Sequence, residues 1–172
     1  DPSRDITALA MTRGAYSAGT SSLFIGASDD PFIGGVATPK LFRLDNPTGV
    51  ATTAVPVDIT GGSFPAGGFI SSIAVSPVSD DVVLVTFSNY GVTSVFYTAD
   101  ANSGAPTWTA VEGGLTLPSY RSSAIADTGA GGLQFFVGTS AGLYNAPAAG
   151  FPGAPVWTQE GPTTIGNAVV SS

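Results

Sequence analysis

The sequence contains no cysteine and no histidine among its 172 residues. These absences exclude disulfide bonds, thiol nucleophiles, imidazole general bases and the usual ligand sets of zinc. Charge is also scarce, since five Lys and Arg stand against twelve Asp and Glu and the net charge is −7. Because nucleic acids and anionic membrane surfaces bind clustered cations, we expect neither as a partner.

Long segments free of glycine and proline are missing as well. The chain has 23 Gly and 13 Pro, and its longest stretch without either runs from Val78 to Tyr90. This stretch, VSDDVVLVTFSNY, is rich in β-branched and aromatic residues and therefore favours strand over helix. No run of 18 apolar residues occurs that would span a bilayer as a helix. A hydrophobic fraction of 43% still provides for a core, so the sequence predicts a folded all-β protein.

A four-part pattern recurs three times along the chain. The copies open with similar runs, which are ITALAMT from Ile6, ISSIAVS from Ile70 and RSSAIAD from Arg121. In each copy a strongly apolar run follows, and then a third and a fourth short run. Units of this size with four short strands are typical of β-propeller blades. We predict one partial propeller over residues 1–172, with four-stranded antiparallel blades at about residues 6–60, 70–115 and 121–162.

The second run of each unit indicates that the sheets are stacked. VVLVTFS, from Val82, shows no alternation of polar and apolar residues, as expected of a strand covered on both faces. After the third unit, GNAVVSS at residues 166–172 resembles the start of another first strand. The prediction is therefore three blades plus one extra terminal strand. Its open faces and edges are expected to associate with further blades or with copies of the chain.

The segment TADANSGAPTW, between the third and fourth runs of the second unit, resembles the Asp-box of bacterial neuraminidase repeats. The surrounding runs are similar to blades of sortilin-like and xyloglucanase-like propellers of secreted bacterial proteins. The resemblance implies a propeller fold and a secreted, extracellular or cell-surface location. It also implies a structural motif in which the Asp accepts backbone N–H groups and the tryptophans pack between strands. The motif residues are Thr98, Asp100, Gly104, Thr107 and Trp108, with Trp157 in the third unit.

Candidate ligand-binding residues are few. Asp29 and Asp30 lie in a predicted insertion of the first unit, where we expect either a solvated loop or, with nearby carbonyls, a Ca²⁺ site. Phe64 and Phe69 lie in the linker SFPAGGF and are expected either to cover the edge of the core or to stack on a sugar. We expect no other cofactor and no confident metal site.

No catalytic residue is assigned. Asp80 and Asp81 are adjacent in a turn and point to opposite faces, whereas glycoside hydrolysis needs two carboxylates across a cleft. Glu112 and Glu160 are expected at equivalent places of the repeat. The leading hypothesis is a non-catalytic extracellular module for structure or binding, with carbohydrate as a candidate ligand. The alternative is a fragment of a carbohydrate-active propeller enzyme whose catalytic residues lie partly outside this chain.

Overall fold

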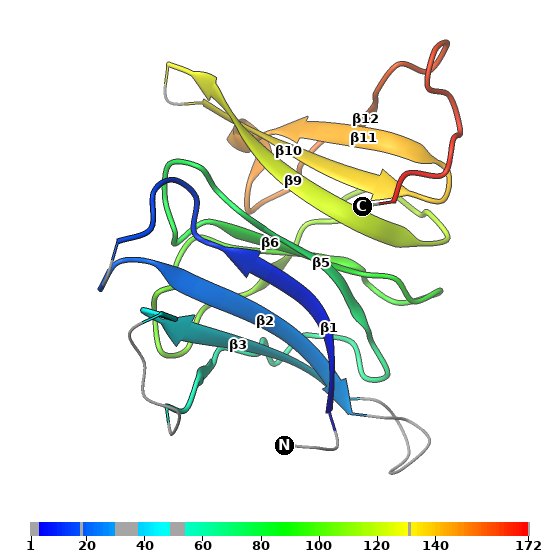
Figure 1. Ribbon diagram of the computed structural model, residues 1–172. Helices are drawn as coiled ribbons and strands as arrows, with labels where there is room; N and C mark the ends of the chain where they lie inside the picture. Colours follow the sequence, from blue (N-terminus) through cyan, green and yellow to red (C-terminus); the bar gives the residue numbers. More distant parts are fainter. Residues whose placement is uncertain (1–3, 18, 30–37, 49–53, 131, 172) are drawn as a thin grey trace.

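A computed structural model describes residues 4–17, 19–29, 38–48, 54–130 and 132–171 of the chain. The described residues form twelve strands and one short 3₁₀ helix, η1 (Ala148–Gly150). The strands make three four-stranded antiparallel sheets, which stack one above the other (Figure 1). The predicted fold class is confirmed: the protein is all-β, each sheet corresponds to one blade, and the three blades do not close into a ring.

Each sheet is an up-and-down meander in which neighbours in sequence are neighbours in the sheet. Sheet 1 consists of β1 (Arg4–Met11), β2 (Ser22–Asp29), β3 (Pro39–Asp45) and β4 (Val57–Asp58). Sheet 2 consists of β5 (Ile70–Val75), β6 (Val83–Phe87), β7 (Val95–Thr98) and β8 (Thr109–Ala110). Sheet 3 consists of β9 (Tyr120–Gly129), β10 (Gly132–Thr139), β11 (Gly142–Pro147) and β12 (Thr158–Gln159). Every fourth strand is only two residues long, so each sheet exposes a short outer edge.

The first strands share a β-bulge at the same place. The pairing with the second strand skips one residue in each sheet, and these residues are Thr7, Ser71 and Arg121. A bulge changes the direction of the side chains around it and is a specific feature of a strand. The residues just before the bulges therefore hold one structural position, which is occupied by Ile6, Ile70 and Tyr120. The sheets are thus repeats in structure as well as in sequence.

Two hydrophobic clusters hold the three sheets together, one in each gap between neighbouring sheets. β6 contributes to both clusters, because Val83, Val85 and Phe87 face sheet 1 whereas Leu84 faces sheet 3. All five residues of this strand are buried. A strand covered on both faces needs no polar alternation, which explains why Thr86 is the only polar residue of β6.

Small residues let the first strands approach one another. Ser123 of β9 donates from its backbone N–H and shares a hydroxyl hydrogen bond with the Oγ of Ser72 in β5, at 3.1 and 3.0 Å. A cavity of about 230 Å³ remains where β1, β5 and β9 meet, and residues such as Ala74, Ala124 and Arg13 line it. The stack is therefore closest along its first strands, as in a propeller.

The C-terminal segment differs from its predicted form. Residues 166–171 belong to no sheet, although the backbone N–H of Val170 donates to the carbonyl of Thr139 in sheet 3 at 2.9 Å. A strand requires a ladder of bonds to one neighbour, and among the described residues this segment shares only that one backbone bond with sheet 3. Residues 166 and 167 lie in a turn and residues 168–171 belong to no strand, so the expected extra strand is not formed within the described residues. The predicted insertion of the first unit falls mainly on residues 30–37, outside the described ranges.

Gly26 of β2 tests the packing of sheet 1 on sheet 2. A β-carbon at this position would lie 2.9 Å from Cγ2 of Ile70. We expect Gly26→Ala to lower the free energy of unfolding by about 1–3 kcal/mol through overpacking, measured by urea denaturation. Gly104→Ala is the control, since a β-carbon there meets no atom within 4 Å, and its effect should stay within about 0.5 kcal/mol. Equal effects of the two substitutions would contradict this packing.

Candidate functional site

The turn between β7 and β8 is organised around the side chain of Asp100. The backbone N–H of Thr107 donates to both carboxylate oxygens of Asp100, at 3.0 and 3.2 Å. The hydroxyl of Thr98 donates to Oδ1 of Asp100, and its Oγ1 accepts the Asp100 backbone N–H at 3.2 Å. The structure thus brings together three residues of the predicted motif. Gly104 lies in the exposed part of the turn, where the surrounding space does not require glycine.

Both tryptophans link neighbouring sheets. Trp108 precedes β8 of sheet 2 and donates its indole Nε1–H to the carbonyl of Ile59, just after β4 of sheet 1, at 2.9 Å. Trp157 precedes β12 of sheet 3 and donates to the carbonyl of Val111, just after β8 of sheet 2, at 2.8 Å. Each indole therefore satisfies a carbonyl at the outer edge of the preceding sheet.

Phe64 lies beside the first of these tryptophans. Its ring centroid is 5.2 Å from that of Trp108 and 5.1 Å from those of Phe87 and Phe96. It covers the edge of the core between sheets 1 and 2, which is one of its two expected roles. Phe69 is partly buried just before β5.

A second phenylalanine, which was not singled out from the sequence, covers the edge of the core at sheet 3. Phe151 follows η1, stacks on Phe135 with a centroid distance of 4.1 Å and lies 5.9 Å from the ring of Trp157. The flanking Gly150 and Pro152 are typical of a loop, so the sequence carries no periodic signal for this packing role.

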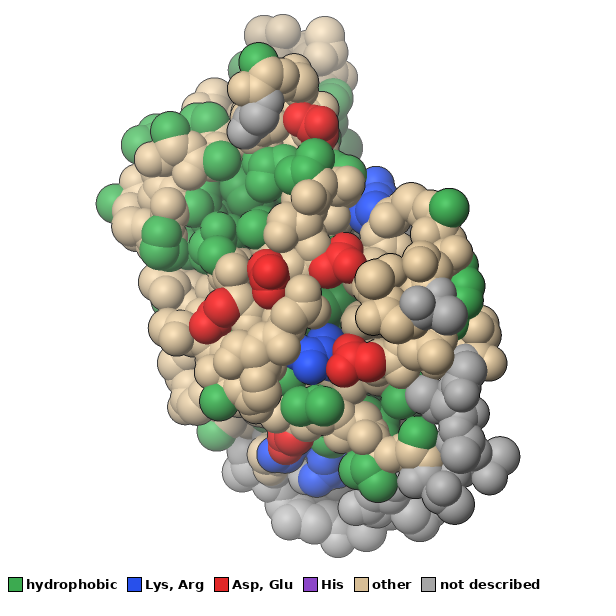
Figure 2. Space-filling view, turned by 90° about the vertical axis from the view of Figure 1, so that its left-hand side faces the viewer, with side chains coloured by type: hydrophobic (Ala, Val, Ile, Leu, Met, Phe, Trp, Pro, Cys, Tyr) green, Lys and Arg blue, Asp and Glu red, His purple; other side chains and the backbone are tan. Residues whose placement is uncertain are grey.

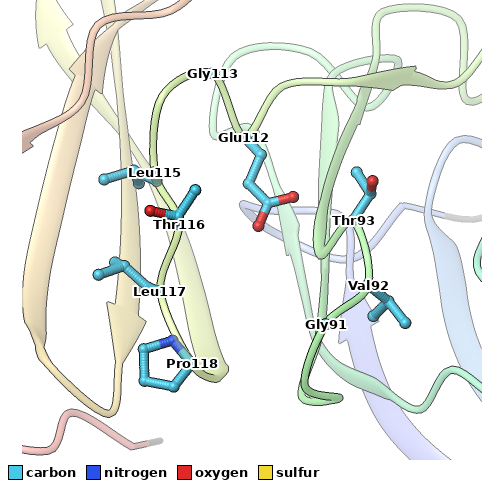
Figure 3. Close-up of a pocket in the computed structure, with 9 residues that line it drawn as sticks. All are labelled: Gly91, Val92, Thr93, Glu112, Gly113, Leu115, Thr116, Leu117 and Pro118. Carbon is cyan, nitrogen blue, oxygen red and sulfur yellow. The ribbon is translucent and has the colours of Figure 1, made fainter.

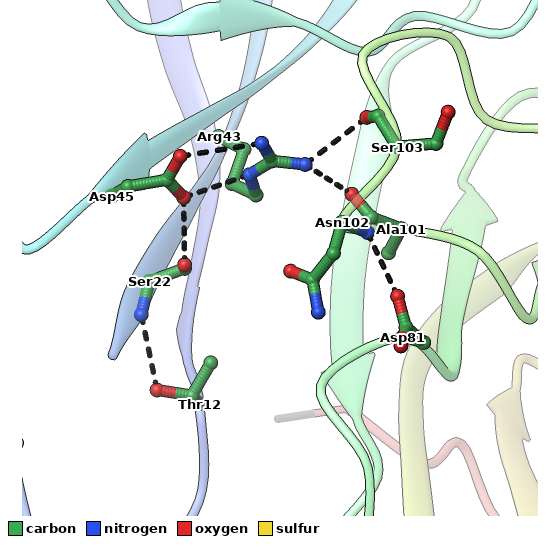
Figure 4. A network of polar contacts seen from close by, with 8 residues as sticks. All are labelled: Thr12, Ser22, Arg43, Asp45, Asp81, Ala101, Asn102 and Ser103. Carbon is green, nitrogen blue, oxygen red and sulfur yellow. Dashed lines mark hydrogen bonds and ion pairs between the residues drawn. The ribbon is translucent and has the colours of Figure 1, made fainter. Parts of the chain in front are cut away.

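Arg43 of β3 reaches from sheet 1 to the Asp100 turn (Figure 4). Its side chain is held by the Asp45 carboxylate, which accepts from Nε at 2.8 Å and from Nη2 at 3.2 Å. Nη1 donates to the carbonyls of Ala101 and Ser103 at 2.6 and 3.1 Å. Arg43 is only 7% exposed, so its guanidinium is largely desolvated. The bidentate bond to Asp45 orients it toward the carbonyls of the neighbouring sheet.

This network was missed in the sequence, although the spacing carried a signal. Arg43 and Asp45 are two residues apart in KLFRLD, so they lie on one face of a strand. Hydrogen bonding from Arg43 holds the pKa of Asp45 below its ordinary value, against the opposing effect of burial. On the other side of the turn, Asp81 accepts the backbone N–H of Asn102 at 3.1 Å (Figure 4).

An open pocket of about 560 Å³ lies between the β6–β7 loop and the linker from sheet 2 to sheet 3 (Figure 3). The Glu112 side chain points into it, between Thr93 on one side and Thr116 on the other. One carboxylate oxygen of Glu112 accepts the backbone N–H of Ser94 at 2.9 Å. Among the described residues that line the pocket, Glu112 is the only carboxylate, so the pocket offers no pair for glycoside hydrolysis.

Tyr120 lies fully buried behind this pocket and donates its hydroxyl to the carbonyl of Leu115 at 3.1 Å. Burial, and then the negative charge of Glu112, raise the pKa of Tyr120 well above its ordinary value. The phenol therefore stays protonated at neutral pH and serves as a hydrogen-bond donor inside the fold.

The two glutamates predicted to be equivalent are not. Ala110 and Gln159 hold the same place in the fourth strands, as their pairing with the third strands shows. Glu112 is two residues beyond Ala110, whereas Glu160 is one residue beyond Gln159, so the two side chains lie on opposite faces. The prediction was wrong by one residue, because TAVEG is one residue longer than TQEG. Glu160 accepts instead from Nδ2 of Asn145 at 2.7 Å.

The predicted Ca²⁺ loop lies mostly outside the described residues. Asp29 is the last residue of β2, and Asp30 falls in the range that the structure does not describe. Within the described ranges, no three His, Cys, Asp or Glu side chains lie close enough to hold a metal ion.

Charged side chains of both signs are interspersed among small and hydrophobic ones on the face shown in Figure 2. In the part of the chain that the structure describes, no helix is long and apolar enough to cross a membrane. The sequence matches no known family model, and no curated protein matches it.

Arg43→Met tests the bridge between sheet 1 and the Asp100 turn. We expect it to lower the free energy of unfolding at neutral pH by about 2 kcal/mol, because two partly buried carbonyls lose their donor. The Asp45 pKa is depressed in the fold, so its contribution is present above its ordinary pKa and is lost as the pH falls through the folded value. Acid should therefore destabilise the wild-type protein more than Arg43→Met, as measured by urea denaturation between pH 7 and 3. The exposed Arg13→Met is the control and should keep the wild-type pH profile.

Proposed function

We propose that this protein is a non-catalytic extracellular module of the Asp-box propeller type, which functions by joining further blades of its own kind or copies of itself. The main support is the outer face of sheet 1, which exposes apolar side chains at positions that are buried in the other two sheets. Contiguous exposed apolar surface of this kind marks an interaction site.

The repeat makes the comparison direct. Ile6 is 65% exposed, whereas Ile70 and Tyr120, which hold the same position before the bulge, are 1% and 0% exposed. Leu9 and Met11 are also exposed, although Ile73 and Val75 at the same register positions of β5 are buried against sheet 1. Sheet 1 therefore presents the face that sheets 2 and 3 each bury against a preceding sheet.

An apolar groove of about 390 Å³ runs across this outer face. Pro56 lies at its edge and holds the register position of Trp108, because Val57 and Thr109 pair equivalently with the third strands. In sheet 2 the corresponding region is filled by Trp108 and Phe64. The groove on sheet 1 therefore resembles the interface between sheets 1 and 2 without the aromatic side chains that fill that interface. Its lining residues include Ile6, Ile25, Ala27, Phe42 and Val55.

The carboxylates support a non-catalytic role, because most of those described are engaged within the fold. Asp100 closes a turn, Asp45 holds Arg43, and Asp58 binds Lys40 at 2.8 Å. Others accept backbone or amide N–H groups, and these are Asp81, Asp127, Glu112 and Glu160. Carboxylates that are fixed to their own chain in this way serve structure first.

The association can be tested by light scattering. We expect the mass in solution to exceed 17.1 kDa and to rise with concentration. Ile6→Glu should lower it, because a charge would then have to be desolvated in the interface. Val78→Glu is the matched control, since Val78 is 60% exposed but lies on the β5–β6 turn away from this face, and it should keep the wild-type mass. A chain that stays at 17.1 kDa at all concentrations would contradict association between copies.

The second candidate function is part of a carbohydrate-active propeller, and it is favoured by the open pocket beside Glu112 with its threonine hydroxyls. A panel of polysaccharides distinguishes the two. We expect no turnover, because none of the described residues that line the pocket offers Glu112 a second carboxylate. Hydrolysis that is abolished by Glu112→Gln and kept by Asp127→Asn would overturn the non-catalytic proposal. Binding without hydrolysis would agree with a carbohydrate-binding role for the same module.

A further inference from the structure

The C-terminal segment lies in a notch on the open face of sheet 3. A β-carbon built on Gly138 of β10 would lie 2.7 Å from Cγ1 of Val170, so the valine side chain sits directly over the glycine. The backbone N–H of Val170 donates to the carbonyl of Thr139, the next residue of β10, at 2.9 Å. Residue 170 is therefore fixed to the second strand of sheet 3.

In the first gap, the first residue of the following sheet makes the same contact with a glycine. Gly26 of β2 holds the register position of Gly138, and a β-carbon on it would lie 2.9 Å from Cγ2 of Ile70, the first residue of β5. In the second gap, Thr86 holds this position. There the hydroxyl of Ser71, 2.9 Å from that of Thr86, donates to the carbonyl of Tyr120, the first residue of β9, at 3.0 Å. Val170 thus occupies the place where a first strand starts.

The sequence around residue 170 agrees with this register. Val170, Ser171 and Ser172 follow the order of Ile70, Ser71 and Ser72, so Ser171 falls on the bulge position. Because the bulge recurs in all three first strands, this match places residues 168–171 in the same frame as β5.

The open face of sheet 3 is equivalent to the faces of sheets 1 and 2 that the following sheet covers. Phe136 and Leu143 are partly exposed on sheet 3, although the residues at their register positions are fully buried between sheets. Those buried residues are Phe24 and Leu41 in sheet 1 and Leu84 and Val95 in sheet 2.

Two further residues mark the missing neighbour. Glu160 is the first residue after β12, and the equivalent residues after β4 and β8 are Ile59 and Val111. The carbonyls of Ile59 and Val111 each accept a tryptophan N–H from the following sheet. Ile165 is exposed on the terminal segment five residues after Glu160, as Phe64 stands five residues after Ile59. Phe64 is covered by the aromatic residues of sheet 2, whereas no sheet covers Ile165 in the described structure.

We propose that residues 168–171 begin the first strand of a fourth blade, and that the open face of sheet 3 binds the rest of that blade. This inference rests on the proposed assembly function and names its partner. The partner is a four-stranded sheet of the same repeat, entered through Ser171, with a tryptophan before its fourth strand that donates to the carbonyl of Glu160. A second copy docking through its sheet 1 would have to place Ile6 over Gly138, where Val170 already lies.

The experiment appends a copy of residues 73–112 directly after Ser172, so that Ser171 and Ser172 stand in for Ser71 and Ser72. We expect the added blade to fold onto sheet 3. The indole N–H of its tryptophan should exchange with solvent on the order of tenfold or more slowly than in a control with one glycine inserted after Ser172. The control shifts the register by one residue and turns the apolar side chains to the wrong face. Tryptophan emission should move to shorter wavelength only in the matched chain.

Two outcomes would overturn the inference. The first is equal exchange of the added indole in the matched and the shifted chains. The second is a rise in mass of the unextended protein when residues 168–172 are removed, which would assign the notch to a second copy. If the matched blade fails to dock while the unextended chain still associates, the proposed assembly stands and the fourth blade is wrong. Gly138→Val in the matched chain should abolish the protection, because its side chain would displace Val170 from the notch.

Discussion

The middle sheet of this protein is covered on both faces, and the stacking of the other two sheets depends on that burial. β6 shows it most clearly, because consecutive residues Leu84 and Val85 are both fully buried, one against sheet 3 and the other against sheet 1. Burying such a side chain contributes about 1.5–3 kcal/mol, whereas a hydrogen bond contributes about 1 kcal/mol net. Face-to-face burial of apolar side chains therefore drives the stacking of the sheets.

The polar contacts at the edges determine how the sheets align. The turn after β7 is closed internally by Asp100, held on one side by Arg43 and followed directly by Trp108, which binds the edge of sheet 1. The contacts of Arg43 and Trp108 join sheet 2 to sheet 1 at defined atoms, whereas apolar contact alone would tolerate sliding. Directional bonds to backbone carbonyls thus convert a non-directional attraction into a single arrangement.

The fold could be predicted from the sequence because its main signal is local. The run from Val82 has the composition of a doubly buried strand, and the recurrence of four runs in each unit gave the three sheets. The parts that sequence reasoning missed depend on contacts between sheets. Arg43 finds its carbonyl partners 58 and 60 residues away, and Phe151 packs on the core although it lies in a loop. The offset between Glu112 and Glu160 arose from a single residue in a turn, which only the strand pairing reveals.

The two ends of the stack differ in chemistry, which gives any assembly a direction. The outer face of sheet 1 carries apolar side chains around Ile6 and Phe42, with the guanidinium of Arg4 over the Phe42 ring. The outer face of sheet 3 carries an amide and carboxylate chain, in which Gln134 donates to Asn145 and Asn145 donates to Glu160. Arg43 and Tyr97 hold the register position of Asn145 in the other sheets, and both contact the following sheet. A partner of sheet 3 therefore meets amides and a carboxylate, whereas a partner of sheet 1 meets an apolar groove with one guanidinium, that of Arg4. Because unpaired buried polar groups are costly, the two outer faces favour different neighbours.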